Sequence, residues 1–277
     1  MKHIILLTSG VNPNGMPLTA LSDINDRKQQ YLDALRFYVN NTSLPIVYID
    51  NSNVNIKEYN VFSNIAEDRL ELLSFDGNHD KKHGKGYGEL EIIDYAINHS
   101  RIINNNKNVS LIKITGRLII VNIATILKQL KYNILPSSNS VICSMNSDFS
   151  MADSRLFIAP LNFYKRLIEN RMAINDSEGV YLEHVLCSLI KKQNLYEFHP
   201  FFTEPQYQGV SGSTNITYEA NKHTFFEEIR YTEYVISQFF MFPYAKKKHF
   251  YNNFIRKSIL LLLFISLKLI NIFSSCK

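Results

Sequence analysis

The sequence predicts a single α/β domain with a mixed, mainly parallel central sheet flanked by helices, followed by a helical C-terminal extension. Short apolar runs typical of buried parallel strands alternate with segments of helical periodicity over the first 200 residues. The chain has 277 residues, of which 45% are hydrophobic and 20% charged. That size and composition suit one large domain and are not those of a disordered chain.

The N-terminal elements have the order of a βαβ unit. The first strand is expected at Ile4–Leu7, since this apolar run is too short for the hydrophobic region of a signal peptide. A polar loop follows, then a helix over Asp26–Asn40 and a second strand over Ile46–Ile49. This order predicts a right-handed crossover between parallel strands.

The middle of the chain continues the alternation. A Gly-rich loop, His79–Gly88, leads into a helix over Glu89–His99, and Asn122 can cap a helix that begins at residue 123. The remaining expected elements are strands over Val109–Thr115, Val141–Met145 and Arg155–Ala159, an apolar segment over Leu118–Val121, and helices from Pro160 to about Arg171 and over Glu178–Lys192.

Charge is concentrated at the C-terminus. The net charge is +5, and residues 246–277 carry seven Lys or Arg and no acid, which leaves about −2 for the rest. This favours an anionic membrane surface as partner over nucleic acid. The apolar run Ser258–Phe273 is shorter than the ~20 residues that span a bilayer, so we expect an interfacial helix with a basic collar. A helix docked on the protein's own core is the alternative.

The three cysteines show no metal-ligand spacing and fit a reducing cytoplasm.

Ligands of such sheets bind at the carboxyl ends of strands, so the polar segments there are the places to look for chemistry. They are Thr8–Asn14, Asp50–Asn53, Lys113–Arg117 and Ser144–Arg155.

Two glycine-containing motifs carry basic side chains. In His83–Glu89 the glycines let a backbone approach a ligand, and the following helix N-terminus favours an anion. A flexible surface loop is the alternative reading. Lys113 and Thr115 share one face of their strand. Lys113 and Arg117, at the end of a buried strand, need an anion or solvent, and a diphosphate would satisfy both.

Three acidic positions could act on a substrate. The loop Asp148–Arg155 places two carboxylates where they could hold Mg²⁺ or Mn²⁺, although a polar turn explains it equally well. Glu183 lies on the flank of an apolar helical stripe. It could reach a cleft as a general base, or simply be a carboxylate at the boundary between core and solvent.

The small polar loop Gln208–Asn215 could close on a substrate or be an ordinary connection.

Taken in order, the segments HGKGYGELEIIDYAI, SLIKITGRLIIVNI, ADSRLFIAPLNFY, EGVYLEHVLCSLI and GVSGSTN resemble those of bacterial glycosyltransferases from O-antigen and capsule gene clusters. The resemblance covers roughly residues 1–220. It implies a GT-A-like catalytic domain, a nucleotide-diphosphate sugar donor and a lipid-linked or glycan acceptor. Residues 221–277 would then form a membrane-associating extension that holds the enzyme peripherally at the cytoplasmic face of the inner membrane.

The resemblance also implies a set of site residues. Lys113–Arg117 stands where a compact DxD motif is expected, so dependence on Mn²⁺ or Mg²⁺, through Asp148 or Asp153, stays open beside metal-independent catalysis. Glu183, or failing it Asp153, would deprotonate the acceptor of a hexosyl-type transfer. A non-catalytic nucleotide- or glycan-binding module is the alternative. The predicted donor-binding residues are Thr8, Ser9, Gly10, Asn14, Arg27, Lys85, Gly86, Lys113, Thr115, Gly116 and Arg117.

Overall fold

A seven-stranded sheet with the strand order β3-β2-β1-β4-β7-β6-β8 forms the centre of the protein. The computed structural model describes residues 2–54, 62–106, 108–131, 139–192, 196–220 and 224–241. The strands are β1 (Lys2–Ser9), β2 (Ile46–Asp50), β3 (Leu70–Ser74), β4 (Val109–Thr115), β6 (Ser140–Met145), β7 (Ala152–Pro160) and β8 (Glu197–His199).

Of these strands, only β7 runs against the others. It pairs antiparallel with β4 and with β6, whereas β1–β2, β2–β3, β1–β4 and β6–β8 are parallel pairs. The prediction of a mixed, mainly parallel sheet is therefore confirmed. The register places Ser9 beside Asp50 and Thr8 beside Thr115, so the polar ends of β1, β2 and β4 meet at one edge.

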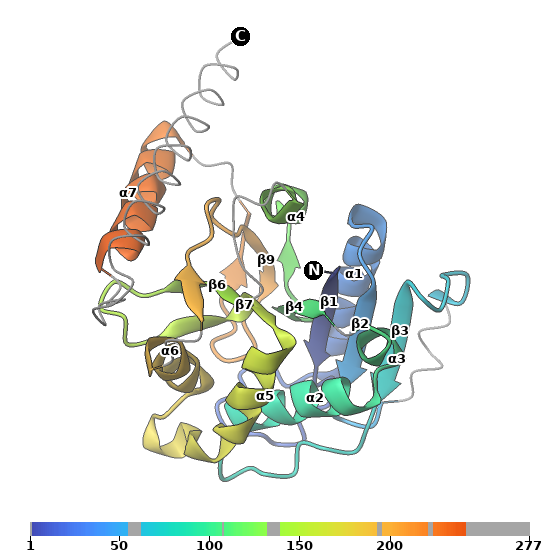
Figure 1. Ribbon diagram of the computed structural model, residues 1–277. Helices are drawn as coiled ribbons and strands as arrows, with labels where there is room; N and C mark the ends of the chain where they lie inside the picture. Colours follow the sequence, from blue (N-terminus) through green and yellow to red (C-terminus); the bar gives the residue numbers. More distant parts are fainter. Residues whose placement is uncertain are drawn as a thin grey trace.

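Helices cover both faces of the sheet (Figure 1). Ile4 and Leu6 of β1 face one core, and Ile5 and Leu7 face the other, as strand alternation requires. The first core is completed by α2 (Lys85–His99), α3 (Arg101–Asn104), α5 (Leu161–Glu169) and α6 (Leu182–Lys192). The second is completed by α1 (Ile24–Asn41), α4 (Ile123–Lys131) and α7 (Phe225–Met241).

A small antiparallel sheet lies beside the main one. It consists of β5 (Ile119–Ile120), β9 (Tyr207–Val210) and β10 (Thr217–Tyr218). The hairpin between β9 and β10 carries residues 211–216 towards the carboxyl end of β4, because β9 pairs with the segment that follows β4. β5 falls within the apolar segment expected over Leu118–Val121, whereas β9 and β10 were not predicted from the sequence.

Helix α2 begins earlier, and helix α6 begins later, than the sequence pattern predicted. Helix α2 begins at Lys85 instead of Glu89, so the Gly-rich motif forms its first turn. Helix α6 begins at Leu182 instead of Glu178, because a 3₁₀ turn over Asp176–Glu178 ends at Gly179 in a left-handed conformation. Asn122 does not use its side chain as a helix cap; that side chain bonds the backbone of residues 204 and 206.

Helix α7 packs on the second core although it follows the predicted boundary at residue 220. The Tyr231 hydroxyl donates to the carbonyl of Phe201 (2.8 Å), and the Tyr234 hydroxyl donates to that of Met145 (2.8 Å). The division into residues 1–220 and 221–277 stays a prediction, and the predicted tail, 246–277, lies outside the described residues.

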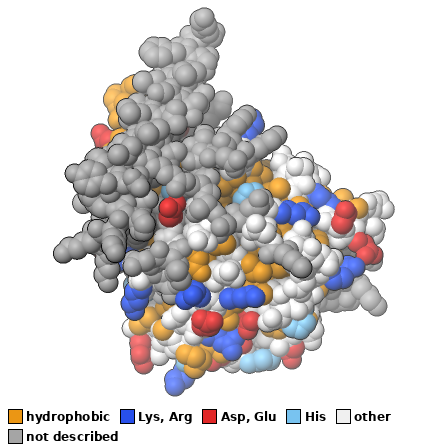
Figure 2. All heavy atoms as spheres, in the orientation of Figure 1, with side chains coloured by type: hydrophobic (Ala, Val, Ile, Leu, Met, Phe, Trp, Pro, Cys, Tyr) orange, Lys and Arg blue, Asp and Glu red, His pale blue; other side chains and the backbone are white. Residues whose placement is uncertain are grey.

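No helix within the described ranges combines the length and apolar character needed to cross a membrane. On the face seen in Figure 2, basic and acidic side chains lie interspersed.

Candidate functional site

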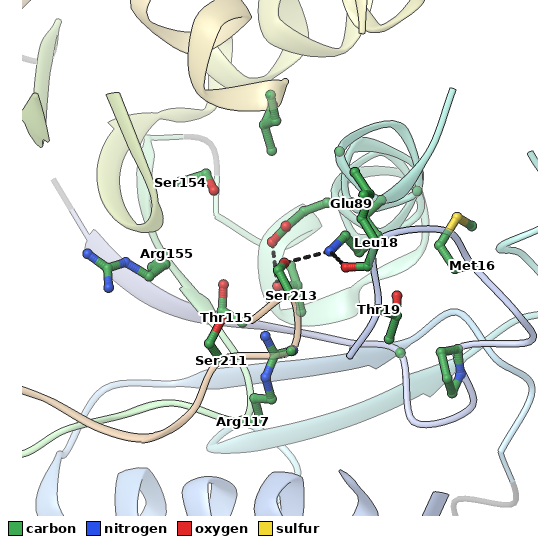
Figure 3. Close-up of a pocket in the computed structure, with 18 of the residues that line it drawn as sticks. Met16, Leu18, Thr19, Glu89, Thr115, Arg117, Ser154, Arg155, Ser211 and Ser213 are labelled. Carbon is green, nitrogen blue, oxygen red and sulfur yellow. Dashed lines mark hydrogen bonds between the residues drawn. The ribbon is translucent and has the colours of Figure 1, made fainter. Parts of the chain in front are cut away.

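A cavity of about 630 Å³ opens at the edge where β1 and β4 end (Figure 3). Its walls are the end of β1 with the loop through residue 19, the first turn of α2, the end of β4, the start of β7, the start of α6, and the β9–β10 loop. Ten predicted site residues line it: Thr8, Ser9, Gly10, Arg27, Lys85, Gly86, Thr115, Arg117, Asp153 and Glu183. The other four, Asn14, Lys113, Gly116 and Asp148, do not.

Buried Asp50 shapes the loop after β1. Its Oδ2 accepts hydrogen bonds from the Ser9 hydroxyl (2.7 Å) and the Val11 amide (2.9 Å). Its Oδ1 accepts from the Ser52 amide (2.8 Å). Because β2 lies beside β1, this carboxylate ties the two strand ends together and fixes the backbone that borders the cavity.

Arg27 holds the same loop from α1. Its guanidinium donates to the carbonyls of Gly10, Val11 (3.0 Å) and Leu21 (3.0 Å), and the Tyr31 hydroxyl accepts from the Gly10 amide (3.1 Å). Arg27 therefore donates its hydrogen bonds to loop carbonyls, and its positive charge lies at the cavity wall. Sequence reasoning placed Arg27 at this site but missed that it holds the loop.

The first turn of α2 is built around a contact between distant residues. Gly84 has φ +87°, and a Cβ there would lie 2.4 Å from Oδ2 of Asp176. The same Asp176 oxygen accepts the Lys85 amide (2.7 Å), which satisfies one of the free donors at the helix start. Asp176 thereby joins the α2 N-terminus to the segment that precedes α6.

Lys85 bridges two loops over the cavity. Its ammonium donates to the carbonyl of Leu18 and to the hydroxyl of Ser213 (Figure 3). Burial lowers the pKa of Lys85, opposed by the nearby carboxylate of Asp176 and reinforced by the cation of Arg117. Lys85 and Arg117 are therefore close enough for their positive charges to interact.

Arg117 is the cavity cation with the fewest internal partners. Its Nε donates to the carbonyl of Val210 (3.1 Å), and no described carboxylate forms an ion pair with it. A Cβ on Gly212 would lie 2.6 Å from Nη2, so that glycine lets the β9–β10 loop lie against the guanidinium. The half-buried charge of Arg117 thus borders the cavity without a counter-ion among the described residues.

Gly116 and Asn14 have local structural roles. The Gly116 amide donates to the carbonyl of Thr8 (2.8 Å), and a Cβ on Gly116 would lie 2.7 Å from that oxygen. Gly116 therefore permits β4 to end against β1. Asn14 sits in a left-handed turn, where its amide donates to the Asn12 side chain (2.9 Å).

Lys113 requires a correction. Its side chain is completely buried, and its ammonium pairs with Glu89 and donates to the carbonyl of Ser154 (2.5 Å). The alternation correctly placed Lys113 and Thr115 on one face of β4, but α2 covers that face and supplies the anion. In this arrangement Lys113 cannot contact a diphosphate, because no part of it reaches the cavity.

The two predicted general bases differ in their partners. Asp153 accepts hydrogen bonds from Nε (2.9 Å) and Nη2 (2.8 Å) of Arg155 and from the Tyr207 hydroxyl (3.2 Å). Glu183 accepts a hydrogen bond from the Ser154 hydroxyl (2.5 Å). Asp153 is committed to a guanidinium, so Glu183 is the better placed of the two to take a proton from a substrate.

The predicted metal ligands do not form a site. Hydrogen bonds from the Ser150 hydroxyl and amide lower the pKa of exposed Asp148, which closes its own turn outside the cavity. Asp153 faces Arg155. Within the described ranges, no group of three or more His, Cys, Asp or Glu side chains is arranged to hold a metal ion. Among the described residues, Asp148 and Asp153 are therefore not arranged as a Mn²⁺ or Mg²⁺ centre.

Several cavity residues escaped sequence reasoning. Glu89 is the last residue of the motif His83–Glu89, but no separate role was predicted for it. Asp176 lies 91 positions from the helix start that it caps, and no local pattern reveals such a pairing. Ser154, Arg155 and Tyr31 were likewise missed.

No family model matches the chain, and no curated protein matches it significantly. Among solved structures, the protein is similar to S. aureus TarS 1–349 in complex with UDP-GlcNAc, with 10% identity and a TM-score of 0.42 over 96% of this chain and 72% of that one. For the same protein in complex with UDP, the identity is 10% and the TM-score 0.36, over 96% and 71%.

Proposed function

We propose that the protein is a glycosyltransferase that moves a sugar from a nucleotide-diphosphate donor to an acceptor hydroxyl. The observation that carries the proposal is Arg117, a cation without a described counter-ion, which lines the same cavity as Lys85 and Glu183. The cavity's volume of about 630 Å³ lies within the usual range for small-molecule sites. Its place at the carboxyl ends of parallel strands is also the usual one for ligands of α/β sheets.

The charges of the cavity support a diphosphate. Asp153 is matched by Arg155, and Glu89 by the buried Lys113. Of the remaining lining charges, the cations Arg27, Lys85 and Arg117 exceed the anions Asp176 and Glu183. An excess of fixed positive charge in a partly enclosed site favours an anionic ligand.

In this proposal the loop after β1 receives the nucleoside, through Thr8, Ser9 and Gly10. Arg117 and Lys85 face the diphosphate. Lys85 has used two ammonium donors on Leu18 and Ser213, and its third can reach a phosphate oxygen.

The reaction requires one proton transfer and the replacement of one bond at the anomeric carbon of the sugar. Glu183 takes the proton of the acceptor hydroxyl while the oxygen of that hydroxyl bonds to the anomeric carbon. The bond from that carbon to the phosphate oxygen breaks, and the electron pair leaves with the nucleoside diphosphate. Arg117 and Lys85 stabilise the charge that develops there, as preorganised cations do in a site shielded from water.

Calorimetric titration of UDP and GDP against uridine and guanosine tests the donor site. We expect one diphosphate to bind at least about tenfold more tightly than its nucleoside, since charge-assisted hydrogen bonds are each worth about 1.5–3 kcal/mol. Binding of a nucleotide sugar without any turnover would instead support the non-catalytic binding module. Equal affinities for diphosphate and nucleoside would contradict the assignment of Arg117.

The acceptor, pathway and location belong to the proposal as well. We place the enzyme in O-antigen or capsule synthesis, acting as a hexosyltransferase on a lipid-linked glycan, peripherally at the cytoplasmic face of the inner membrane. The basic, apolar sequence of residues 246–277 supports this location, with juxtamembrane cations worth about 1 kcal/mol each near anionic lipid.

Co-sedimentation with anionic and neutral vesicles tests the membrane proposal. A chain ending at Ala245 retains α7 and its contacts with the core, so we expect it to fold and to stay in the supernatant. The full chain should sediment with anionic vesicles and be partly released by salt. Equal sedimentation of both chains would contradict the role of the tail.

A further inference from the structure

A continuous set of contacts runs beneath the cavity from α2 to α6. The buried ammonium of Lys113 pairs with Oε1 of Glu89, which also accepts the Thr8 hydroxyl (2.9 Å). On its other side, Lys113 donates to the carbonyl of Ser154 (2.5 Å), whose hydroxyl donates to Oε1 of Glu183 (2.5 Å). One buried cation therefore contacts Glu89 directly and also contacts Ser154, the residue that bonds to Glu183.

The second oxygen of Glu89 is available to a ligand. Glu89 lines the cavity, its side chain is 22% exposed, and no described residue donates a hydrogen bond to Oε2. In Figure 3 its carboxyl group points into the space between Ser154, Thr115 and Ser213. Thr8 and Lys113 hold the other oxygen, so the free one is presented in a fixed orientation.

The chemistry of that oxygen selects its partner. A carboxylate oxygen beside a buried ammonium accepts hydrogen bonds and repels phosphate. Its ligand must therefore be a hydrogen-bond donor, and hydroxyl groups are the most numerous neutral donors of a nucleotide sugar.

We propose that Glu89 binds a hydroxyl of the transferred sugar and that Lys113 is the positioning residue that holds Glu89, and through Ser154 also Glu183. This inference rests on the proposed function, because it divides the cavity into diphosphate contacts at Arg117 and a sugar contact at Glu89.

The test measures the sugar increment, defined as the affinity for a nucleotide sugar divided by the affinity for its nucleoside diphosphate. Calorimetry uses UDP with UDP-GlcNAc, UDP-glucose and UDP-galactose, and GDP with GDP-mannose. Glu89→Gln should reduce the increment about tenfold, the difference between a charged and a neutral acceptor, and leave diphosphate affinity unchanged. Asp94→Asn is the matched control, a carboxylate on the same helix outside the cavity.

The role of Lys113 is tested in two backgrounds. Lys113→Met should reduce the sugar increment about tenfold in the parent and have no further effect on the increment in Glu89→Gln. The double variant removes both members of the ion pair, so it folds even where Lys113→Met alone leaves Glu89 without its cation. Lys113→Met should also lower turnover in the Glu89→Gln background, because Ser154 then no longer fixes Glu183.

The outcomes separate this inference from the proposed function. If no nucleoside diphosphate or nucleotide sugar binds, the proposed function fails and the inference with it. If they bind and Glu89→Gln keeps the parent's increment, only the inference is wrong. Equal losses for diphosphate and nucleotide sugar would place Glu89 at the ribose and also overturn it, as would a parent without any increment.

Discussion

At the scale of single residues, the basic side chains of the site differ in what they are free to do. Lys113 is buried against Glu89, and Arg155 is bonded to Asp153 through two nitrogens. Within the part of the chain that the structure describes, Arg117 donates only through Nε, to a backbone carbonyl. An exposed or lining cation can bind a ligand only with donors that the protein has not already used, so Arg117 carries the donor-binding claim.

Arg117→Met should weaken nucleoside-diphosphate binding about 10- to 100-fold and leave nucleoside binding nearly unchanged, because the methionine keeps apolar bulk and removes the charged donors. Calorimetry with both ligands measures the difference. Arg36→Met on α1, where Arg36 pairs with Asp33 on the surface, is the matched control. A variant that binds the diphosphate as the parent does would remove Arg117 from the site.

Glu183→Gln should retain donor affinity and lose about 10²- to 10⁴-fold in turnover, as expected for a general base. The Ser154 hydroxyl still has an acceptor in this variant, so the local structure is preserved. Glu178→Gln, outside the cavity in the preceding 3₁₀ turn, is the control. Turnover within a few-fold of the parent would exclude Glu183 as the base.

Residue-level sequence reasoning succeeded where a strand pattern was involved and failed where two elements meet. Alternation in β4 put Lys113 and Thr115 on one face. The sequence could not show that α2 covers that face and brings Glu89 against Lys113, because the packing of a helix on a strand is set by the whole core.

At the scale of elements, the beginning of α2 depends on a conformation and a contact together. Gly84 has φ +87°, and Asp176 occupies the space where a Cβ would lie. The sequence pattern could not place this start, because the capping carboxylate comes from a 3₁₀ turn far along the chain.

Gly84→Ala should therefore lower the free energy of unfolding more than Gly179→Ala. Gly179 (φ +76°, ψ 15°) lies in the left-handed helical region, which costs a non-glycine residue about 1–2 kcal/mol. Gly84 (φ +87°, ψ −163°) lies in a region almost restricted to glycine, where the cost is about 1–3 kcal/mol. Only at Gly84 does the new methyl displace Asp176 from the helix start, which adds the loss of a cap, about 0.5–2 kcal/mol. Urea denaturation of both variants measures the difference; equal losses would show that the Asp176 contact contributes nothing to stability.

At the scale of the whole molecule, the order of the strands creates the site. The ends of β1 and β4 meet because the two strands are parallel neighbours, and the crossovers bring α2 and α6 to the same edge. Apolar runs and helical periodicity were sufficient to predict the α/β class and the mainly parallel sheet. They could not predict β8, β9 and β10, which are two to four residues long and have no pattern of their own.

The most direct test of the central claim is the release of UDP or GDP from a panel of nucleotide sugars by the purified full-length protein, followed by mass spectrometry with and without Mn²⁺. We predict release from at least one donor, reduced in Arg117→Met through weaker binding and in Glu183→Gln through slower turnover. A protein that binds the nucleoside diphosphate and releases none from any donor, with a lipid-linked acceptor supplied, would contradict it.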